Sequence, residues 1–201
     1  ILNYGLGNLL SIKNMLKKVG AESVITNDIN VVEAATKIIL PGVGHFDYGM
    51  KKLRESGFYD ALNKKAQVEK IPVLGICLGA QMLLNGSEEG AEPGLTWIDG
   101  FSRRFDFSSL SKSLPIPNMG WQDVKYVKET RLTDGLDIHP RYYFVHSYCM
   151  QCVNREDVLA TAHYGYDYTV AVQHENIYGV QFHPEKSHRF GMQLLKNFTA
   201  I

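Results

Sequence analysis

The chain has 201 residues and a formal net charge of zero, because 21 lysines and arginines balance 21 aspartates and glutamates. This length is enough for one domain with a full hydrophobic core. The balanced charge gives no overall field that would attract nucleic acid or an anionic membrane, so we expect neither as a partner. No apolar run approaches the roughly 18 residues of a membrane span, and we expect no signal peptide.

The chain contains three cysteines, Cys77, Cys149 and Cys152. They are too few for a disulfide scaffold, so a reducing cytoplasm is the expected location. Cys149 and Cys152 form a C-x-x-C that leaves a strand and has no second pair, so we expect neither a thioredoxin-type site nor a structural metal. The chain begins at Ile1 without a methionine, inside the pattern of a first strand, and we expect a few residues to precede it.

The first half of the chain alternates short apolar runs with helical patterns. Strand patterns occupy residues 1–3, 23–26, 37–40 and 73–76, and helical patterns occupy residues 9–19, 30–35, 46–55, 58–68 and 78–84. This alternation predicts an α/β fold with a doubly wound, mostly parallel sheet and a site at the carboxyl ends of its strands. The turn after the first strand holds only two glycines of a dinucleotide fingerprint, so we expect no nucleotide cofactor.

The strand pattern at 73–76 ends in Gly75-Ile76-Cys77-Leu78-Gly79. Strand, Gly-x-Cys-x-Gly and helix are the layout of a nucleophile elbow with cysteine in place of serine. The sharp turn leaves little room for side chains, which explains the glycines. It also places the cysteine at a helix N-terminus, where the dipole favours negative charge. The alternative is a small buried cysteine where a helix crosses a sheet.

A nucleophile that attacks a carbonyl carbon needs backbone N–H groups to stabilise the negative oxygen that results. The amide of Leu78 is one expected donor. The loop Gly42-Val43-Gly44 is the candidate for a second, since glycines let a backbone approach a ligand closely. A plain strand-to-helix turn is the alternative. A carboxylate in the polar loop 85–90 is a candidate to hold a substrate ammonium group, with an ordinary solvated loop as the alternative.

The second half of the chain is rich in strand patterns, at residues 121–128, 142–149, 158–164, 169–173 and 178–182. Residues 91–117 are rich in glycine, proline and serine, and we interpret them as loops and short strands. No linker is expected, so residues 1–201 are predicted to form a single domain. Ser187 is expected to cap a last helix whose core face carries Phe190, Leu194, Leu195 and Phe198.

The sequence Gln181-Phe182-His183-Pro184-Glu185 follows the last strand pattern. Residues i and i+2 of an extended segment point the same way, so His183 and Glu185 can address one site. This pair suits a general base and the carboxylate that orients it. On sequence alone, the other six histidines have an equal claim to the role.

Several of these motifs together carry a resemblance. They are Tyr4-Gly-x-Gly-Asn8, Leu40-Pro-Gly-Val-Gly44, Gly75-Ile-Cys-Leu-Gly79 with Gln81, Met119-Gly-Trp121, Phe144-Val-His-Ser-Tyr148 and Gly179-Val-Gln-Phe-His-Pro-Glu-Lys-Ser187. Over essentially its whole length the chain resembles the class I (triad) glutamine amidotransferases. It is most similar to the HisH-type glutaminase subunits of imidazole glycerol phosphate synthase. The resemblance implies a flavodoxin-like class I amidotransferase fold.

The resemblance also implies residue roles. Cys77 would be the nucleophile, His183 the acid and base, and Glu185 its orienter. The oxyanion would be held at Val43, Gly44 and Leu78. The glutamine pocket would be lined by Gly42, Gln81, Glu89, His146, Ser147 and Tyr148. The partner protein would be met by Asn8, Trp121, Tyr143 and Lys186.

The implied activity is hydrolysis of glutamine to glutamate and ammonia through a γ-glutamyl thioester. Ammonia would pass to a (β/α)8 barrel cyclase, the other half of a heterodimer, which makes imidazole glycerol phosphate and AICAR in histidine biosynthesis. Gln122 stands where the family usually has Asn, and Cys149 follows Tyr148 where other residues are usual. Both departures concern the identity of the partner protein and not the glutaminase activity. A paralogous glutaminase that supplies ammonia for a bacterial surface sugar, a stand-alone thiol hydrolase and a non-catalytic binding module are the alternatives.

Overall fold

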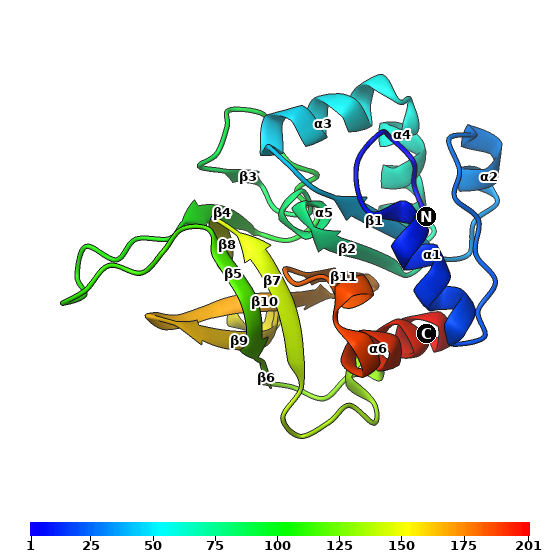
Figure 1. Cartoon of the computed structure of the whole chain (residues 1–201). Coiled ribbons are helices and arrows are strands. Elements are labelled where there is room, and N and C mark those ends of the chain that lie inside the picture. The colour runs from blue at the N-terminus through cyan, green and yellow to red at the C-terminus, as the bar shows by residue number, and fades with distance from the viewer.

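A nine-stranded mixed sheet runs through the computed structural model, which describes residues 1–201 (Figure 1). Its parallel part consists of β1 (Ile38–Gly42), β2 (Val73–Cys77) and β11 (Ile177–Val180), with β2 in the middle. Every residue of these three strands is buried. Such continuous apolar runs are typical of parallel strands that are covered on both faces.

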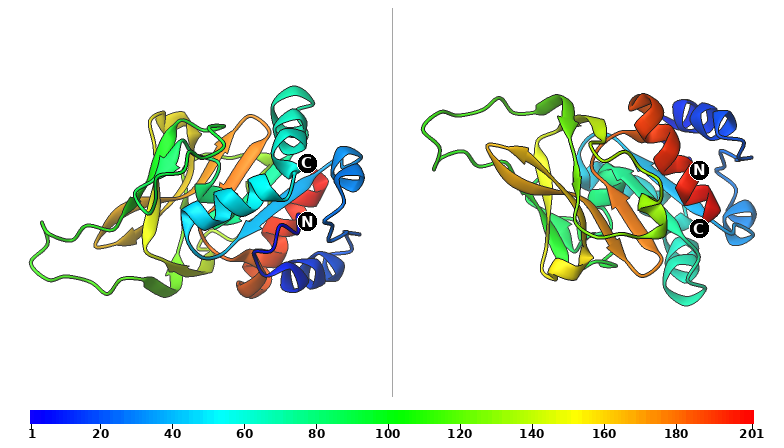
Figure 2. Two further views of the ribbon diagram at one scale, coloured as in Figure 1. Left: turned by 90° about the horizontal axis from the view of Figure 1, so that it is seen from above. Right: turned by 90° about the horizontal axis from the view of Figure 1, so that it is seen from below.

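The helices cover the parallel strands from both sides (Figures 1 and 2). Side chains of α1 (Leu9–Lys18) and α6 (His188–Ala200) share one core cluster with Ile39 and Leu74. Side chains of α2 (Ile29–Glu33), α3 (Phe46–Glu55) and α4 (Phe58–Asn63) share the other with Leu40 and Val73. Neighbouring strand residues enter opposite cores because strand side chains alternate between the faces. A π-helical turn, η1 (Lys64–Val68), continues α4.

Antiparallel strands extend the sheet beyond β11. They are β10 (Tyr166–His174), β8 (Tyr148–Cys152) and β4 (Gly100–Arg104), with β3 (Gly86–Ser87) at the edge and β9 (Val158–Tyr164) and β6 (Lys125–Tyr126) branching from β10. A separate antiparallel pair joins β5 (Asn118–Asp123) to β7 (Arg141–His146). The predicted α/β fold with extra strands in the second half is therefore confirmed. Parallel pairing is confined to β1–β2–β11 and β3–β4, so the sheet is mixed.

Short 3-10 turns complete the chain at η2 (Arg131–Thr133), η3 (Arg155–Asp157) and η4 (Pro184–Lys186). The loop between β4 and β5 projects from the body of the molecule, and both termini lie beside α1 and α6 (Figure 2). None of the helices combines the length and the apolar character needed to cross a membrane.

Several predicted elements differ in the structure. The strands predicted at 1–3 and 23–26 reduce to one bridge between Leu2 and Thr26. The helix predicted at 78–84 ends early, as α5 (Leu78–Gln81), because the carbonyls of the following residues accept hydrogen bonds from the segment 95–98 instead of from the next helical turn. The strand predicted at 142–149 is divided at Ser147 between β7 and β8.

Candidate active site

Cys77 occupies a strained turn between β2 and α5. Its backbone has φ 55° and ψ −111°, a conformation that non-glycine residues rarely adopt. A Cβ on Gly75 would lie 2.7 Å from the carbonyl oxygen of Gly79, and a Cβ on Gly79 would overlap the carbonyl oxygen of Leu40. The two glycines are thus required for α5 to pack against β1 and β2, as the predicted elbow demands.

His183 and Glu185 form a buried pair just after β11. His183 Nδ1 lies 2.8 Å from Glu185 Oε1, and the histidine is only 2% exposed. Its other ring nitrogen, Nε2, is buried and has no hydrogen-bond partner. The carboxylate therefore fixes the ring through one nitrogen and leaves the second for proton transfer.

The pKa of His183 is raised from 6.5 to about 9. Burial opposes the charged imidazole, but the neighbouring side chains of Cys77 and Glu185 favour it and outweigh the burial. Strand register places the sulfur beside this segment, because Val180 of β11 lies opposite Ile76 of β2 and Gln181 Nε2 lies 3.7 Å from Cys77 Sγ. The predicted nucleophile, base and orienting carboxylate therefore lie together.

Strand β7 holds the histidine segment in place. The His183 amide donates to the Tyr143 carbonyl at 2.9 Å. The Ser187 hydroxyl donates to the His183 carbonyl at 2.6 Å and accepts from the Tyr143 amide at 3.0 Å. Ser187 is the N-cap residue of α6, as predicted, but its hydroxyl makes no capping hydrogen bond because it is used by β7 and by the turn before the helix.

Two glutamine side chains lead from β8 to the sulfur. Gln81 Nε2 donates to the Tyr148 carbonyl at 3.1 Å and to Gln181 Oε1 at 3.0 Å. Gln181 Nε2 in turn lies 3.7 Å from Cys77 Sγ. Gln181 is fully buried, and no role was predicted for it from the sequence. The same i, i+2 spacing that pairs His183 with Glu185 also relates Gln181 to His183, and it was the available signal.

The predicted oxyanion groups lie where β1 meets α5. A Cβ on Gly42 would come within 3.0 Å of Gly79 N, the Leu78 side chain and the Tyr4 hydroxyl, so the two backbones are in close contact there. Val43 and Gly44 follow in an exposed loop, and Gly44 has φ +98°. Their amides donate no hydrogen bond within the chain, which leaves them available to a ligand.

The other predicted pocket residues lie around the same place. Glu89 Oε2 accepts from the Phe46 amide at 2.8 Å, which ties the loop after α5 to the helix that follows the Val43–Gly44 loop. Ser147 lies at the bend between β7 and β8.

His146 is buried, with Nδ1 2.8 Å from the Tyr148 carbonyl. Burial lowers the pKa of His146 to about 4, against the opposing effect of the Tyr148 hydrogen bond. The neighbouring His183 contributes to the lowering.

Three of the four predicted partner residues gather on one surface. The rings of Trp121 and Tyr143 are cross-strand neighbours on β5 and β7, and Lys186 Nζ lies 5.6 Å from the Tyr143 ring. His188, which sequence analysis did not single out, stacks on Trp121 at 5.4 Å. Asn8 is half-buried at the start of α1, a helix that packs against η4.

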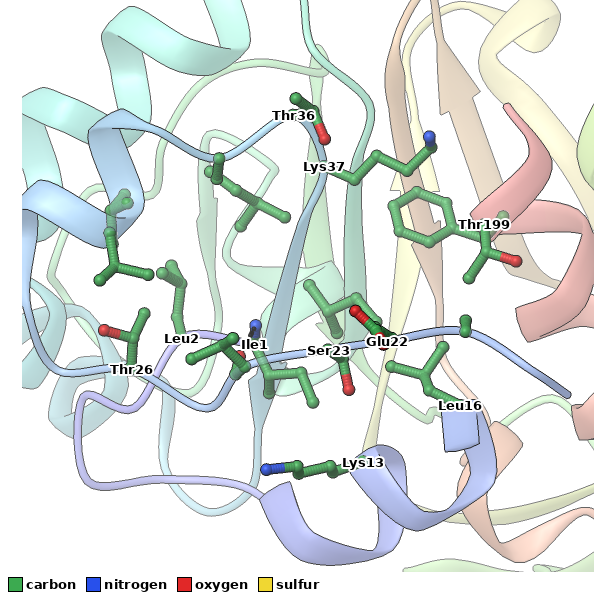
Figure 3. Close-up of a pocket in the computed structure, with 18 of the residues that line it drawn as sticks. Ile1, Leu2, Lys13, Leu16, Glu22, Ser23, Thr26, Thr36, Lys37 and Thr199 are labelled. Carbon is green, nitrogen blue, oxygen red and sulfur yellow. Dashed lines mark hydrogen bonds between the residues drawn. The ribbon is translucent and has the colours of Figure 1, made fainter. Parts of the chain in front are cut away.

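A cavity of about 1050 Å³ lies elsewhere, between α1, α2 and the start of the chain (Figure 3). It is lined by Leu2, Lys13, Leu16, Thr26 and Lys37 among others and contains none of the predicted site residues. No group of three or more histidine, cysteine, aspartate or glutamate side chains lies together in a way that would hold a metal ion.

Comparison with known proteins places this chain and its fold in a class. A model of the family "Glutamine amidotransferase class-I" matches residues 1–201. A solved structure described as "Crystal structure of glutamine amidotransferase" superposes with a TM-score of 0.71 at 21% identity, covering 96% of this chain and 97% of that one, which supports the fold. The chain belongs to the class-I glutamine amidotransferase family.

Curated relatives narrow the similarity further. The chain is 51% identical to imidazole glycerol phosphate synthase subunit HisH 2 of Methanococcus maripaludis, over 98% of this chain and 96% of the relative. It is 48% identical to the subunit of the same name from Pseudomonas aeruginosa, over 100% of this chain and 98% of the relative. Similarity at this level and over the whole length is to proteins named as HisH subunits of imidazole glycerol phosphate synthase.

Proposed function

We propose that the chain is the glutaminase subunit of an imidazole glycerol phosphate synthase and acts through the triad Cys77, His183 and Glu185. The observation that carries the proposal is the buried His183–Glu185 pair beside the strained cysteine elbow. The full-length similarity to HisH subunits supports the substrate and the pathway. Residues 1–201 act as one domain in this proposal, and the expected location is the cytoplasm.

In the proposed reaction the Cys77 sulfur attacks the side-chain amide carbon of glutamine. The oxyanion that forms is held by backbone amides of Leu78 and of the loop Val43–Gly44. His183 gives its proton to the departing ammonia, which leaves a γ-glutamyl thioester on the sulfur. Water activated by His183 then releases glutamate, while Glu185 keeps the ring oriented.

The glutamine pocket in this proposal is lined by Gly42, Gln81, Glu89, His146, Ser147 and Tyr148. Gln81 donates its amide hydrogens to protein acceptors, so its Oε1 is left to accept from the substrate. Glu89 uses Oε2 for the Phe46 amide, and its Oε1 is left to bind the substrate ammonium. The tight packing of Gly42 against Gly79 brings the oxyanion loop to the edge of this pocket.

The relatives are named as subunits, which supports a partner protein that takes up the ammonia. The proposed partner is a (β/α)8 barrel cyclase, and the proposed contact surface contains Asn8, Trp121, Tyr143 and Lys186. Apolar side chains are exposed there, since Met119 is 62% and Trp121 38% exposed. Exposed tryptophan and methionine side chains are typical of interface centres.

Glutamate release from glutamine tests the proposal, measured with the chain alone and with the cyclase and its nucleotide ligand. Cys77→Ala is the inactive control. We expect weak activity alone and a steep rise with the cyclase. Trp121→Ala should lose most of the activation by the cyclase. Tyr48→Ala removes an exposed aromatic ring elsewhere, on α3, and should keep the activation.

Each other result contradicts part of the proposal. Activity that needs Cys77 but ignores the cyclase would favour a glutaminase that supplies ammonia for a surface sugar, and Gln122 is the sequence feature that favours this second candidate. Full activity without any partner would favour a stand-alone thiol hydrolase. Absence of activity with every partner would refute the proposed enzymatic activity.

A further inference from the structure

Three side chains, Asn118, Gln122 and Tyr168, form a closed ring of hydrogen bonds beside His146. Gln122 Nε2 donates to Asn118 Oδ1 at 2.7 Å, and the Tyr168 hydroxyl donates to Gln122 Oε1 at 2.8 Å. Asn118 Nδ2 closes the ring by donating to the Tyr168 hydroxyl at 3.0 Å, and it also lies 3.2 Å from His146 Nε2. Asn118 and Gln122 belong to β5, and Tyr168 belongs to β10.

The direction of these hydrogen bonds determines the protonation of His146. Amide nitrogens only donate and amide oxygens only accept. The Tyr168 oxygen also lies 3.3 Å from His146 Nε2, but the single hydroxyl hydrogen of Tyr168 is directed to Gln122 Oε1. Asn118 Nδ2 has two hydrogens, one for the Tyr168 oxygen and one for His146 Nε2. A hydrogen on Nε2 would face these amide hydrogens, so Nε2 acts as an acceptor in this arrangement.

The other nitrogen of His146 gives the same answer independently. Nδ1 lies 2.8 Å from the Tyr148 carbonyl oxygen, which is only an acceptor, so Nδ1 carries the hydrogen. If the amide groups of the ring were turned over, an oxygen of Asn118 would face Nε2 and the ring would favour a doubly protonated, charged His146. The orientation in the structure, with Asn118 Nδ2 toward His146 Nε2, favours the neutral form.

The consequence reaches the nucleophile. The Tyr148 carbonyl accepts from both His146 and Gln81, and Gln81 holds the Gln181 side chain whose Nε2 faces Cys77 Sγ. A charged His146 would also place a second positive imidazole near His183, whose own charge is needed for proton transfer. The protonation state of His146 therefore affects both the charge and the hydrogen bonding in the pocket.

We infer that Asn118, Gln122 and Tyr168 are positioning residues that keep His146 neutral with its proton on Nδ1. They thereby leave His183 as the charged imidazole of the site and hold the Tyr148 carbonyl for Gln81. The inference rests on the proposed glutaminase function for its effect on turnover. The protonation state itself is independent of that function.

The test is nitrogen NMR of the histidine rings in the ¹⁵N-labelled full chain near pH 7. The chain has seven histidines, and His146→Gln identifies the signal of this one. We expect a neutral ring with the hydrogen on Nδ1. Asn118→Asp replaces the donor by carboxylate oxygens, so both nitrogens of His146 should become protonated. The kcat of the activated complex should fall about tenfold or more.

Two further variants keep the test informative if Asn118→Asp does not fold. Gln122→Met and Tyr168→Phe each remove hydrogen-bonding groups of the ring at similar volume, and each should raise the pH at which His146 titrates. Tyr164→Phe is the matched control, because the Tyr164 hydroxyl donates to Pro115 outside the ring. It should leave the His146 signals and kcat unchanged.

Three results would overturn the inference. The first is a wild-type His146 that near pH 7 has its hydrogen on Nε2 or has both nitrogens protonated. The second is a folded Asn118→Asp chain in which His146 stays neutral. The third is an Asn118→Asp chain in which His146 is protonated but kcat is unaltered. If the wild-type chain lacks glutaminase activity with every partner, the proposed function fails while the NMR result still decides the protonation of His146.

Discussion

Replacing Cys77 by alanine should lower the pKa of His183. The rise from 6.5 to about 9 corresponds to about 3 kcal/mol in favour of the charged ring, contributed by Cys77 and Glu185 against an opposing burial. Without the sulfur, burial still lowers the pKa of His183, and only Glu185 remains to raise it. Glu185→Gln, which keeps the shape of the side chain and removes its charge, should also lower this pKa, because it removes the other neighbour.

The assay is a pH titration of the His183 ring signals by NMR in the wild type and in both variants. A wild-type ring that titrates near 6.5, or a ring that still titrates near 9 without the sulfur, would refute the reasoning. The same shift affects stability. Because the folded-state pKa lies above the unfolded value, the charged ring adds stability that is fully present below pH 6.5 and is lost as the pH rises through about 9. The unfolding free energy of Cys77→Ala should vary less over this range.

Two further predictions concern how the site is built. Gly79→Ala should lower the free energy of unfolding in urea by about 3 kcal/mol, because the new Cβ would overlap the Leu40 carbonyl. Gly20→Ala is the control and should lower it by about 1 kcal/mol, because its Cβ has open space and only the positive φ opposes it. Equal losses in the two variants would contradict the packing explanation. Ser187→Ala should lower the free energy of unfolding by about 2 kcal/mol and slow turnover, because it leaves the Tyr143 amide and the His183 carbonyl without their partner. Ser56→Ala is the control, because the Ser56 hydroxyl is bonded only within one turn, and it should lower the free energy of unfolding by less than about 1 kcal/mol.

The parts of the site that depend on local backbone geometry were predictable from sequence. The spacing of Gly75, Cys77 and Gly79 predicts a turn that only small flanking residues permit, and the structure has that turn. The spacing of His183 and Glu185 predicts side chains on one face, and the two groups are hydrogen-bonded. In both cases the chemistry depends on residues within four positions of one another, where local rules are strong.

The parts that depend on pairing between distant segments were not predictable. Nothing near Ser187 in the sequence indicates that Tyr143, 44 residues away, uses its hydroxyl, so a capping hydrogen bond was expected there. The ring of Asn118, Gln122 and Tyr168 needs β5 and β10 to meet over His146, and sequence gives no register for that meeting. The division of the strand at Ser147 likewise follows from β7 and β8 joining different sheets.

Strand register explains why one cysteine meets all the other groups. Gly42 of β1 lies opposite Cys77 of β2 in a parallel ladder, so the oxyanion loop leaves β1 level with the sulfur. On the other side Val180 of β11 lies opposite Ile76, so the next residue, Gln181, follows level with Cys77. His183 then comes two residues further, on the same face of an extended chain. Because parallel strands end at the same edge of a sheet, β1, β2 and β11 each deliver one chemical component to a single point. A shift of one residue in either ladder would turn those components to the opposite face.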